Sequence, residues 1–272
     1  MSSRKWRTAA GACAIPGRFP RTSCRWRRNR PRPRRRQDRS GVRRFYRHVG
    51  VAGEAGGFAV LLDGKPVRTP KGLPLLLPTL ALAEAVAGEW LDQGETIRPL
   101  GMPLLRLANT GIDLMAEQAE RSRRALLAYV DTDLICYFAD RPAELLARQR
   151  AAWQPVLDWA NRRYDIALAT THGVNPLRQP AAVGAALERS LAAQSGMPLL
   201  ALQEATVLAG SLLLALAACQ GALSAGDAWA AATVDERFQA ETWGEDPEQA
   251  SRLRDRQREF ADALRLLVLL RG

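Results

Sequence analysis

The stretch "DERFQAETWGED", residues 235–246, gathers five carboxylates around one arginine and one tryptophan: Asp235, Glu236, Glu241, Glu245 and Asp246 with Arg237 and Trp243. Such carboxylates can act as general acid and base, ligate a hard cation, or pair with Arg and Lys on another protein. On a helix, only residues three or four apart face the same way, so these acids cannot all converge on one ion. The spacing therefore argues against a metal site.

Helical periodicity places part of this stretch on one face of a predicted helix from Ser224 to Trp243. The shared face comprises Trp229, Ala232, Glu236, Gln239 and Trp243. Gly244 is expected to end that helix, and Asp246 with Pro247 to cap and start the next, so "WGEDPE" is a predicted helix corner. Capping accounts for Asp246 but not for Glu236, which shares its face with two tryptophans. For either tryptophan, core packing and docking are equally compatible with the pattern.

A second acidic pattern, "YVDTDLICY", contains Asp131 and Asp133 in the DxD form that can hold a divalent cation beside a phosphate. The pattern is short and lies where a long predicted helix ends. Capping and turn formation explain it more simply than a metal site does. A metal-dependent enzyme that uses Asp131 and Asp133, or the Glu236 cluster, stays open as an alternative without further support.

Other catalytic signatures are missing from the sequence. His48 and His172 stand far apart and belong to no HExxH pair, so a histidine-based zinc site is not expected. There is no GxSxG elbow, Walker loop or GxGxxG fingerprint. We therefore expect no catalytic residue, no bound cofactor and no metal.

The net charge of +11 is concentrated at the start of the chain. Of 39 basic and 28 acidic residues, residues 1–44 hold sixteen basic residues and one acid, which leaves 23 basic and 27 acidic residues for the rest. The segment "RWRRNRPRPRRR" has several prolines and no helical apolar repeat, so residues 1–44 are predicted to be a disordered tail. A nucleic-acid arm and an organelle presequence are alternatives; a solvated tail, or upstream sequence translated from a misassigned start, is favoured. No nucleic-acid binding is expected of the mildly acidic body.

Cysteine spacing and hydropathy exclude two further classes. The cysteines show no CxxC spacing, which predicts free thiols: Cys13, Cys24, Cys136 and Cys219. The strongly apolar run "VLAGSLLLALAAC", residues 207–219, is shorter than the about twenty residues that a membrane span needs. It is predicted to be a buried core helix.

The elements that position these residues change type along the chain. Residues 45–79 alternate short extended runs with turns, and the pair Asp63 and Gly64 predicts a hairpin, because a type I′ turn needs positive φ at both central positions. After Pro78 the period becomes helical, with Thr79 as N-cap.

From Pro103 onward the periodicity is helical. One long helix is predicted from Leu104 to Tyr129, and others at about 142–164, 180–195, 199–220, 224–243 and 247–270. Strands followed by helices indicate the α+β class. We expect a small antiparallel β-rich N-terminal domain at 45–102 and a larger all-helical C-terminal domain at 103–272.

Six stretches carry a resemblance to a known family: "GGFAVLLDGKPVRTP" (56–70), "MPLLRLANTGID" (102–113), "YVDTDLICY" (129–137), "RQRAAWQPVLDWA" (148–160), "GSLLLALA" (210–217) and "DERFQAETWGED". In this order they resemble the ATP-twelve type chaperones, also called ATP synthase assembly factor 2, which serve the catalytic head of F-type ATP synthase. The resemblance covers the chain from about Phe45 to the C-terminus.

The resemblance implies a non-enzymatic chaperone that binds the unassembled alpha subunit and keeps it from aggregating before it pairs with beta. The family's emphasis on acidic positions near the C-terminus implies a client-binding role for these residues: Glu236, with Asp235, Gln239, Trp243, Glu245 and Asp246 beside it. Whether Glu236 or Glu245 matters more is left open. We expect a monomer without a membrane span, in the bacterial cytoplasm, or in the mitochondrial matrix if the source is eukaryotic.

Overall fold

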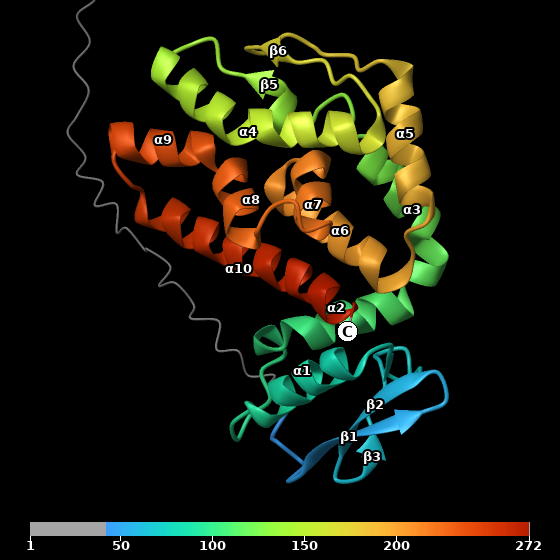
Figure 1. The fold of residues 1–272 in the computed structure, drawn as a ribbon. Helices are drawn as coiled ribbons and strands as arrows, with labels where there is room; N and C mark the ends of the chain where they lie inside the picture. The colour runs from blue at the N-terminus through green and yellow to red at the C-terminus, as the bar shows by residue number, and fades with distance from the viewer. Residues whose placement is uncertain (1–41, 272) are drawn as a thin grey trace, which may run out of the picture. The chain divides into compact units, whose positions relative to one another are not determined.

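The structure, a computed structural model, describes residues 42–271. A small antiparallel sheet comes first and helices follow, which confirms the predicted α+β class (Figure 1). The strands of this sheet are β1 (Val49–Glu54), β2 (Gly57–Leu62), β3 (Lys65–Pro66) and β4 (Leu76–Leu77). β2 pairs antiparallel with each of the other three.

The turn between β2 and β3 forms where the sequence predicts it. Asp63 has a φ of 48° and Gly64 a φ of 79°, the positive values that a type I′ turn requires. The Asp63 carboxylate accepts hydrogen bonds from the backbone N–H groups of His48 (2.8 Å) and Arg47 (3.1 Å). These bonds lower the pKa of Asp63 and tie the turn to the chain before β1.

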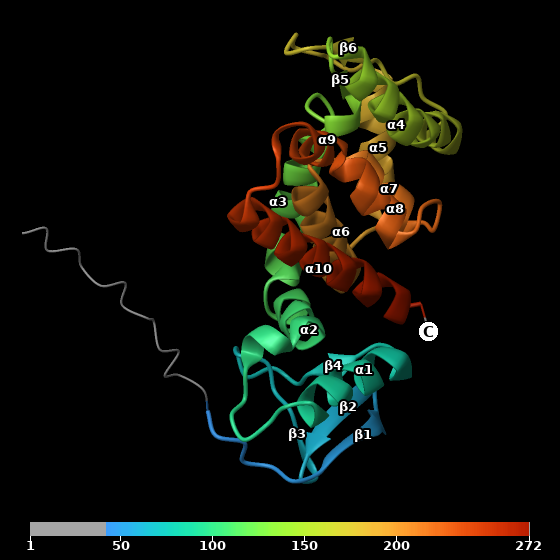
Figure 2. The same ribbon diagram turned by 90° about the vertical axis from the view of Figure 1, so that its left-hand side faces the viewer.

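Helix α1 (Leu80–Leu91) covers one face of the sheet (Figures 1 and 2). The Thr79 hydroxyl accepts a hydrogen bond from the backbone N–H of Leu82 at 3.2 Å, which confirms the predicted N-cap. The core beneath α1 also contains side chains from later helices: Leu104, Leu105, Ala108, Met197, Ala201 and Leu266. This core therefore includes residues on both sides of the proposed domain limit at residues 102 and 103, and that limit stays a prediction.

The other helices are α2 (Pro103–Asp113), α3 (Met115–Leu127), α4 (Ala143–Tyr164), α5 (Ala181–Ala192), α6 (Gly196–Ala209), α7 (Leu212–Cys219), α8 (Ala225–Ala232), α9 (Val234–Trp243) and α10 (Pro247–Leu269), with 3-10 turns η1 (Pro99–Gly101) and η2 (Leu134–Cys136). Helices α4, α5 and α10 confirm the predicted spans. A short parallel pair, β5 (Tyr137–Phe138) with β6 (Thr171–His172), was not predicted. Strands of two residues are too short to show the alternation of apolar and polar residues by which a strand is predicted from sequence.

The prediction of one continuous helix at 104–129 was wrong, because α2 and α3 meet at Leu114, with a φ of −120°. The carboxylate of Asp113 accepts hydrogen bonds from the Thr69 hydroxyl (2.5 Å) and the Lys71 backbone N–H (3.1 Å). The backbone carbonyl oxygen of Asp113 accepts a further hydrogen bond from the Lys71 ammonium at 2.8 Å. The helix thus ends where a loop distant in sequence bonds its last residue.

The predicted helix at 199–220 is also two helices. Gly210, with a φ of 66°, ends α6, as glycine in the left-handed conformation commonly does. The Ser211 hydroxyl then caps α7 by accepting a hydrogen bond from the backbone N–H of Leu214 at 3.0 Å. All of the side chains from Leu212 to Ala217 are buried, which confirms that this apolar run is a core helix. No helix within residues 42–271 is long and apolar enough to cross a membrane.

The predicted helix at 224–243 is broken at Thr233 into α8 and α9. The buried Thr233 hydroxyl donates to the carbonyl oxygen of Trp229 at 2.8 Å. A threonine that bonds the carbonyl four residues back can bend a helix. Trp229 and Glu236 therefore lie on different helices, and the single stripe that the sequence predicted for them was wrong.

The end of the predicted tail, Val42–Arg44, pairs with the chain that precedes η1. The backbone N–H of Ile97 donates to the Val42 carbonyl (2.9 Å), and that of Arg44 donates to the Glu95 carbonyl (2.8 Å). The Arg44 guanidinium donates to the Gln93 carbonyl at 2.7 Å. The rest of the tail lies outside the described residues, so its disorder stays a prediction.

Truncated chains should distinguish the contribution of residues 42–44 to stability from that of residues 1–41. A chain that begins at residue 42 should be as stable as the full chain. One that begins at residue 45 loses these three hydrogen bonds and should fold but melt roughly 6–12 °C lower. Each lost hydrogen bond costs about 0.5–1.5 kcal/mol, and about 1 kcal/mol lowers Tm by roughly 2–4 °C at this size. Calorimetry of the three chains measures the difference. If the chain that begins at residue 45 does not fold, residues 42–44 are essential to the fold and the prediction is wrong.

Candidate functional site

The predicted helix corner forms between α9 and α10, where Figure 1 shows a turn joining the two helices. Gly244, with a φ of 93°, ends α9. The Asp246 carboxylate accepts a hydrogen bond from the Glu248 backbone N–H at 3.0 Å, and Pro247 is the first residue of α10. Both capping predictions are confirmed. An acid at this position also complements the positive end of the helix dipole.

A shallow hollow of about 190 Å³ lies in this corner. Five of the six predicted client-binding residues line it: Glu236, Gln239, Trp243, Glu245 and Asp246. The Trp243 side chain is 76% exposed. The hollow thus combines an exposed aromatic side chain with three carboxylates, a composition suited to a basic and apolar partner surface. We call these five residues the acidic corner.

The sixth predicted residue, Asp235, lies apart from the hollow. Its carboxylate accepts a hydrogen bond from the side-chain amide of the buried Gln149 at 2.7 Å. The same Gln149 amide accepts one from the backbone N–H of Ala139 at 2.7 Å. Asp235 therefore ties α9 to α4, and its carboxylate is already engaged within the protein.

Glu236 is only loosely held. Its side chain is 31% exposed, and its closest cation is the Arg256 guanidinium at 3.9 Å. That guanidinium donates to the Leu208 carbonyl at 2.6 Å and lies over the ring of Trp229. Because Arg256 has other partners, the Glu236 carboxylate keeps free capacity for a cation from outside.

The two tryptophans that the sequence could not separate have different environments. Trp229 is 5% exposed and packs against Phe260, with ring centroids 5.5 Å apart. Trp243 extends into solvent at the end of α9. Trp229 therefore belongs to the core, whereas the exposed Trp243 is placed to contact another molecule.

Arg148 and Phe238, two residues that the sequence did not single out, hold α9 in place. Arg148 on α4 forms ion pairs with Glu241 on α9 and with Glu144. Its guanidinium also lies over the ring of the buried Phe238, 5.2 Å from the centroid. Arg148 stands in a helix rich in charged residues, and the sequence gives no signal that sets it apart.

The DxD pair does not form a joint site. Asp133 is 2% exposed and accepts hydrogen bonds from the Ser211 hydroxyl (2.6 Å) and the Leu213 backbone N–H (3.0 Å). Asp131 accepts one from the backbone N–H of Gln179 at 2.9 Å. The two carboxylates thus join different segments, which agrees with the capping interpretation. Within residues 42–271 there is no group of three His, Cys, Asp or Glu side chains placed to hold a metal ion.

Asp133 should make stability depend on pH. Burial raises its pKa from the ordinary value of 3.8 to about 6, against the lowering effect of its hydrogen bonds. Folding therefore favours the protonated form of Asp133. Its contribution to stability is largest below pH 3.8 and is lost as the pH rises through about 6.

In Asp133→Asn the side chain cannot ionise, so this dependence should disappear. Relative to that of the variant, the free energy of unfolding of the wild type should fall by on the order of 2–3 kcal/mol as the pH rises from 3.8 to about 6. Denaturant titrations of both proteins at several pH values measure the difference. A constant difference across the window would contradict the raised pKa.

Comparisons with known proteins agree on one family. The family model described as ATP12 chaperone protein matches residues 43–161. The crystal structure of Atp12 from Paracoccus denitrificans has a TM-score of 0.81 and 41% identity, and covers 84% of this chain and 98% of that chain. A crystal structure of a protein from Agrobacterium tumefaciens has a TM-score of 0.79 and 41% identity, over 84% of this chain and 86% of that one.

A more distant relative is the mitochondrial protein atp12 of Schizosaccharomyces pombe, 22% identical over 214 residues and 74% of each chain. The acidic corner lies beyond the span that the family model matches. The structural similarity at 41% identity nevertheless extends over nearly the whole of the Paracoccus chain. The chain therefore belongs to the ATP12 chaperone family.

Proposed function

We propose that this protein is an assembly chaperone that binds the unassembled alpha subunit of the F-type ATP synthase catalytic head and prevents its aggregation until it pairs with beta. Membership of the ATP12 chaperone family supports the chaperone role. An isolated alpha subunit exposes apolar and charged surface meant for beta, and covering that surface requires binding but no catalysis. The protein would act as a monomer, in the bacterial cytoplasm or the mitochondrial matrix.

The acidic corner is the observation that carries the proposal. Trp243 is 76% exposed beside the carboxylates of Glu236, Glu245 and Asp246. Tryptophan supplies large buried area at protein interfaces, and carboxylates that pair with Arg or Lys fix the docking register. Because Trp243 contributes nothing to the core, its position is better explained by a partner than by folding.

Co-purification with the cognate alpha subunit, with and without beta, tests the function. The wild-type chaperone should hold the alpha subunit in solution, and addition of beta should release it. Trp243→Ala should reduce this binding and leave Tm unchanged. Leu91→Ala, at an apolar side chain on α1 that is 55% exposed, is the matched control and should bind as the wild type does. If the alpha subunit aggregates equally with and without the wild-type chaperone, the proposal fails.

A further inference from the structure

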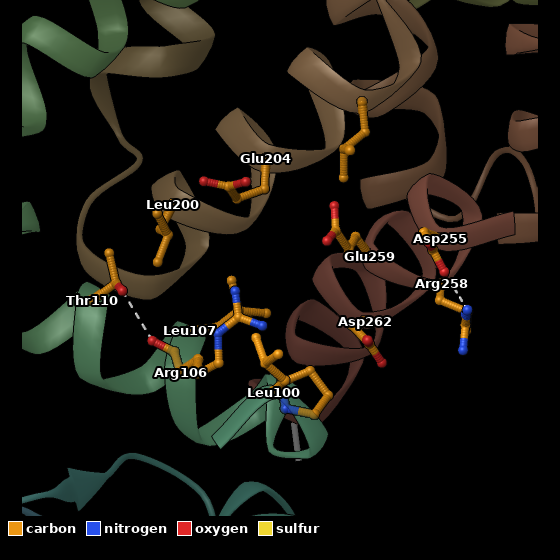
Figure 3. A pocket seen from close by; sticks show the side chains of 12 residues that line it. Leu100, Arg106, Leu107, Thr110, Leu200, Glu204, Asp255, Arg258, Glu259 and Asp262 are labelled. Atoms are coloured by element: carbon orange, nitrogen blue, oxygen red, sulfur yellow. Dashed lines mark hydrogen bonds and ion pairs between the residues drawn. The ribbon is translucent and has the colours of Figure 1, made fainter. Parts of the chain in front are cut away.

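A second concave surface, of about 470 Å³, lies between α2, α6 and α10 (Figure 3). Its apolar lining consists of Leu100, Pro103, Leu107, Leu200 and Leu208. Leu100 is 79% exposed. Pro103, Leu107 and Leu208 are partly exposed as well, whereas Leu200 is buried. Partly exposed apolar side chains around an open hollow are typical of a surface that another protein covers. We call this surface the α2/α6/α10 groove.

Charged side chains line the same groove, with acids in excess. Asp255 and Arg258 pair with each other. The other charged lining residues are Glu204, Glu259, Asp262 and Arg106, which is three carboxylates against one guanidinium. Figure 3 shows Arg106 extending from α2, with Glu204 of α6 and Glu259 of α10 above it. Among the ion pairs of residues 42–271, none includes any of these four.

Burial and neighbouring charges shift the pKa values of two carboxyl groups in the groove. Burial raises the pKa of Glu204, and the nearby charge of Glu259 raises it further. Burial also raises the pKa of Asp262. Arg106 opposes the shift of Glu204, and the charges of Arg265, Arg106 and Arg258 oppose that of Asp262, without cancelling either shift. An additional cation in the groove would therefore be attracted to Glu204 and Glu259, because it would relieve the repulsion between these two carboxylates.

We propose that the α2/α6/α10 groove is a second docking surface for the client, and that it receives a client segment in which an Arg or Lys side chain lies next to an apolar one. This inference rests on the proposed function, since it takes the alpha subunit as the client. The cation would lie between the carboxylates of α6 and α10, and its apolar neighbour against Leu100 and Leu107. The net negative charge of the groove selects this occupant over an acidic one.

The groove and the acidic corner share helix α10. Asp246 caps the first turn of α10, and Glu259 lies further along the same helix. At 1.5 Å per residue Asp246 and Glu259 are about 20 Å apart along the helix axis. Ala250, which lines the hollow of the acidic corner, and Glu259 are two and a half turns apart at 3.6 residues per turn, so the two surfaces lie on opposite sides of α10 and a client that reaches both must wrap around this helix. A client held at both surfaces would bind more tightly and in a more defined orientation than one held at either alone.

Removing charges of opposite sign should have opposite effects. Glu259→Lys should weaken binding of the alpha subunit by at least about tenfold, because a like charge meets the incoming cation. Arg106→Gln removes the competing cation and should strengthen binding. Glu188→Lys, the same charge change at an exposed position on α5, should leave binding unchanged. Dissociation constants are measured on the full chain, and Tm is recorded to show that each variant is folded.

Crosslinking tests the location directly. A photoreactive benzoylphenylalanine at Leu100 should crosslink to the alpha subunit, in a peptide that contains Arg or Lys. The same group at Val268, which is 65% exposed on α10 outside the groove, is the control and should not crosslink.

The outcomes separate this inference from the proposed function. If the wild type fails to bind the alpha subunit, both are overturned. If the wild type binds, but Glu259→Lys and Arg106→Gln bind equally well and Leu100 gives no crosslink, only the groove inference is overturned. Weaker binding by Arg106→Gln would indicate an acidic occupant and would also overturn it.

Discussion

Replacing Leu212 and Leu214 together with asparagine should abolish folding. Both side chains have 0% exposure in α7, which packs against α4, α6, α8 and α10. Truncation of a buried leucine costs about 2–5 kcal/mol, and each buried amide without a partner costs a further about 1–3 kcal/mol. The sum for two positions reaches the whole stability of a typical domain, about 5–15 kcal/mol. Circular dichroism and calorimetry should detect no cooperative transition.

Val207→Asn is the control for this effect. Val207 belongs to the neighbouring helix α6 and is 56% exposed, so the change should alter the free energy of unfolding by no more than about 0.5 kcal/mol. The single variants Leu212→Asn and Leu214→Asn show whether each position contributes. A soluble double variant with the Tm of the wild type would contradict the assignment of α7 to the core.

Glu236→Lys should abolish most client binding while the protein stays folded. The Glu236 side chain is 31% exposed, and within residues 42–271 its ion-pair partner is Arg256 at 3.9 Å, so the loss in stability should be about 1 kcal/mol or less. In the complex, a charge pair with the client becomes a clash between like charges, which should weaken binding by at least about tenfold. Isothermal titration against the alpha subunit measures the loss.

Three further variants sharpen this test. Glu236→Gln removes the charge without reversing it and should have a smaller effect. Glu245→Lys, in the same hollow, decides which of Glu236 and Glu245 matters more. Glu188→Lys controls for the change in net charge. A Tm several degrees lower in Glu236→Lys would identify Glu236 as a structural carboxylate, and normal binding would place the docking surface elsewhere.

Local chemistry determined the features that need only neighbouring residues. The turn at Asp63 and Gly64 follows from the positive φ that a type I′ turn demands. The acidic corner follows from Gly244, which ends one helix, and from Asp246, which caps the next. Helices α4, α5 and α10 follow from their periodicity and flanking residues. In each case the physical cause lies within a few positions, so the sequence alone contains it.

Tertiary structure decided where the long helical patterns break. The Lys71 ammonium donates a hydrogen bond to the backbone carbonyl oxygen of Asp113, although Lys71 lies far away in sequence, in the loop before β4. At Thr233, burial among other helices accompanies the hydrogen bond to the Trp229 carbonyl. A hydrophobic period continues smoothly through both positions, because it records which face is apolar, and neither the hydrogen bonds of the backbone there nor the depth of burial.

The environment of each candidate site residue was likewise decided by the tertiary structure. Trp229 and Trp243 have the same chemistry and adjacent helical contexts, yet one packs on Phe260 and the other meets solvent. The α2/α6/α10 groove joins Arg106 to Glu204 and Glu259, residues far apart in the chain. Sequence spacing fixes which side chains share one helix face, but burial and charge balance depend on which helices meet. Only the tertiary packing determines the burial and the charge balance of a side chain, because both arise from contacts between helices and strands and not within one of them.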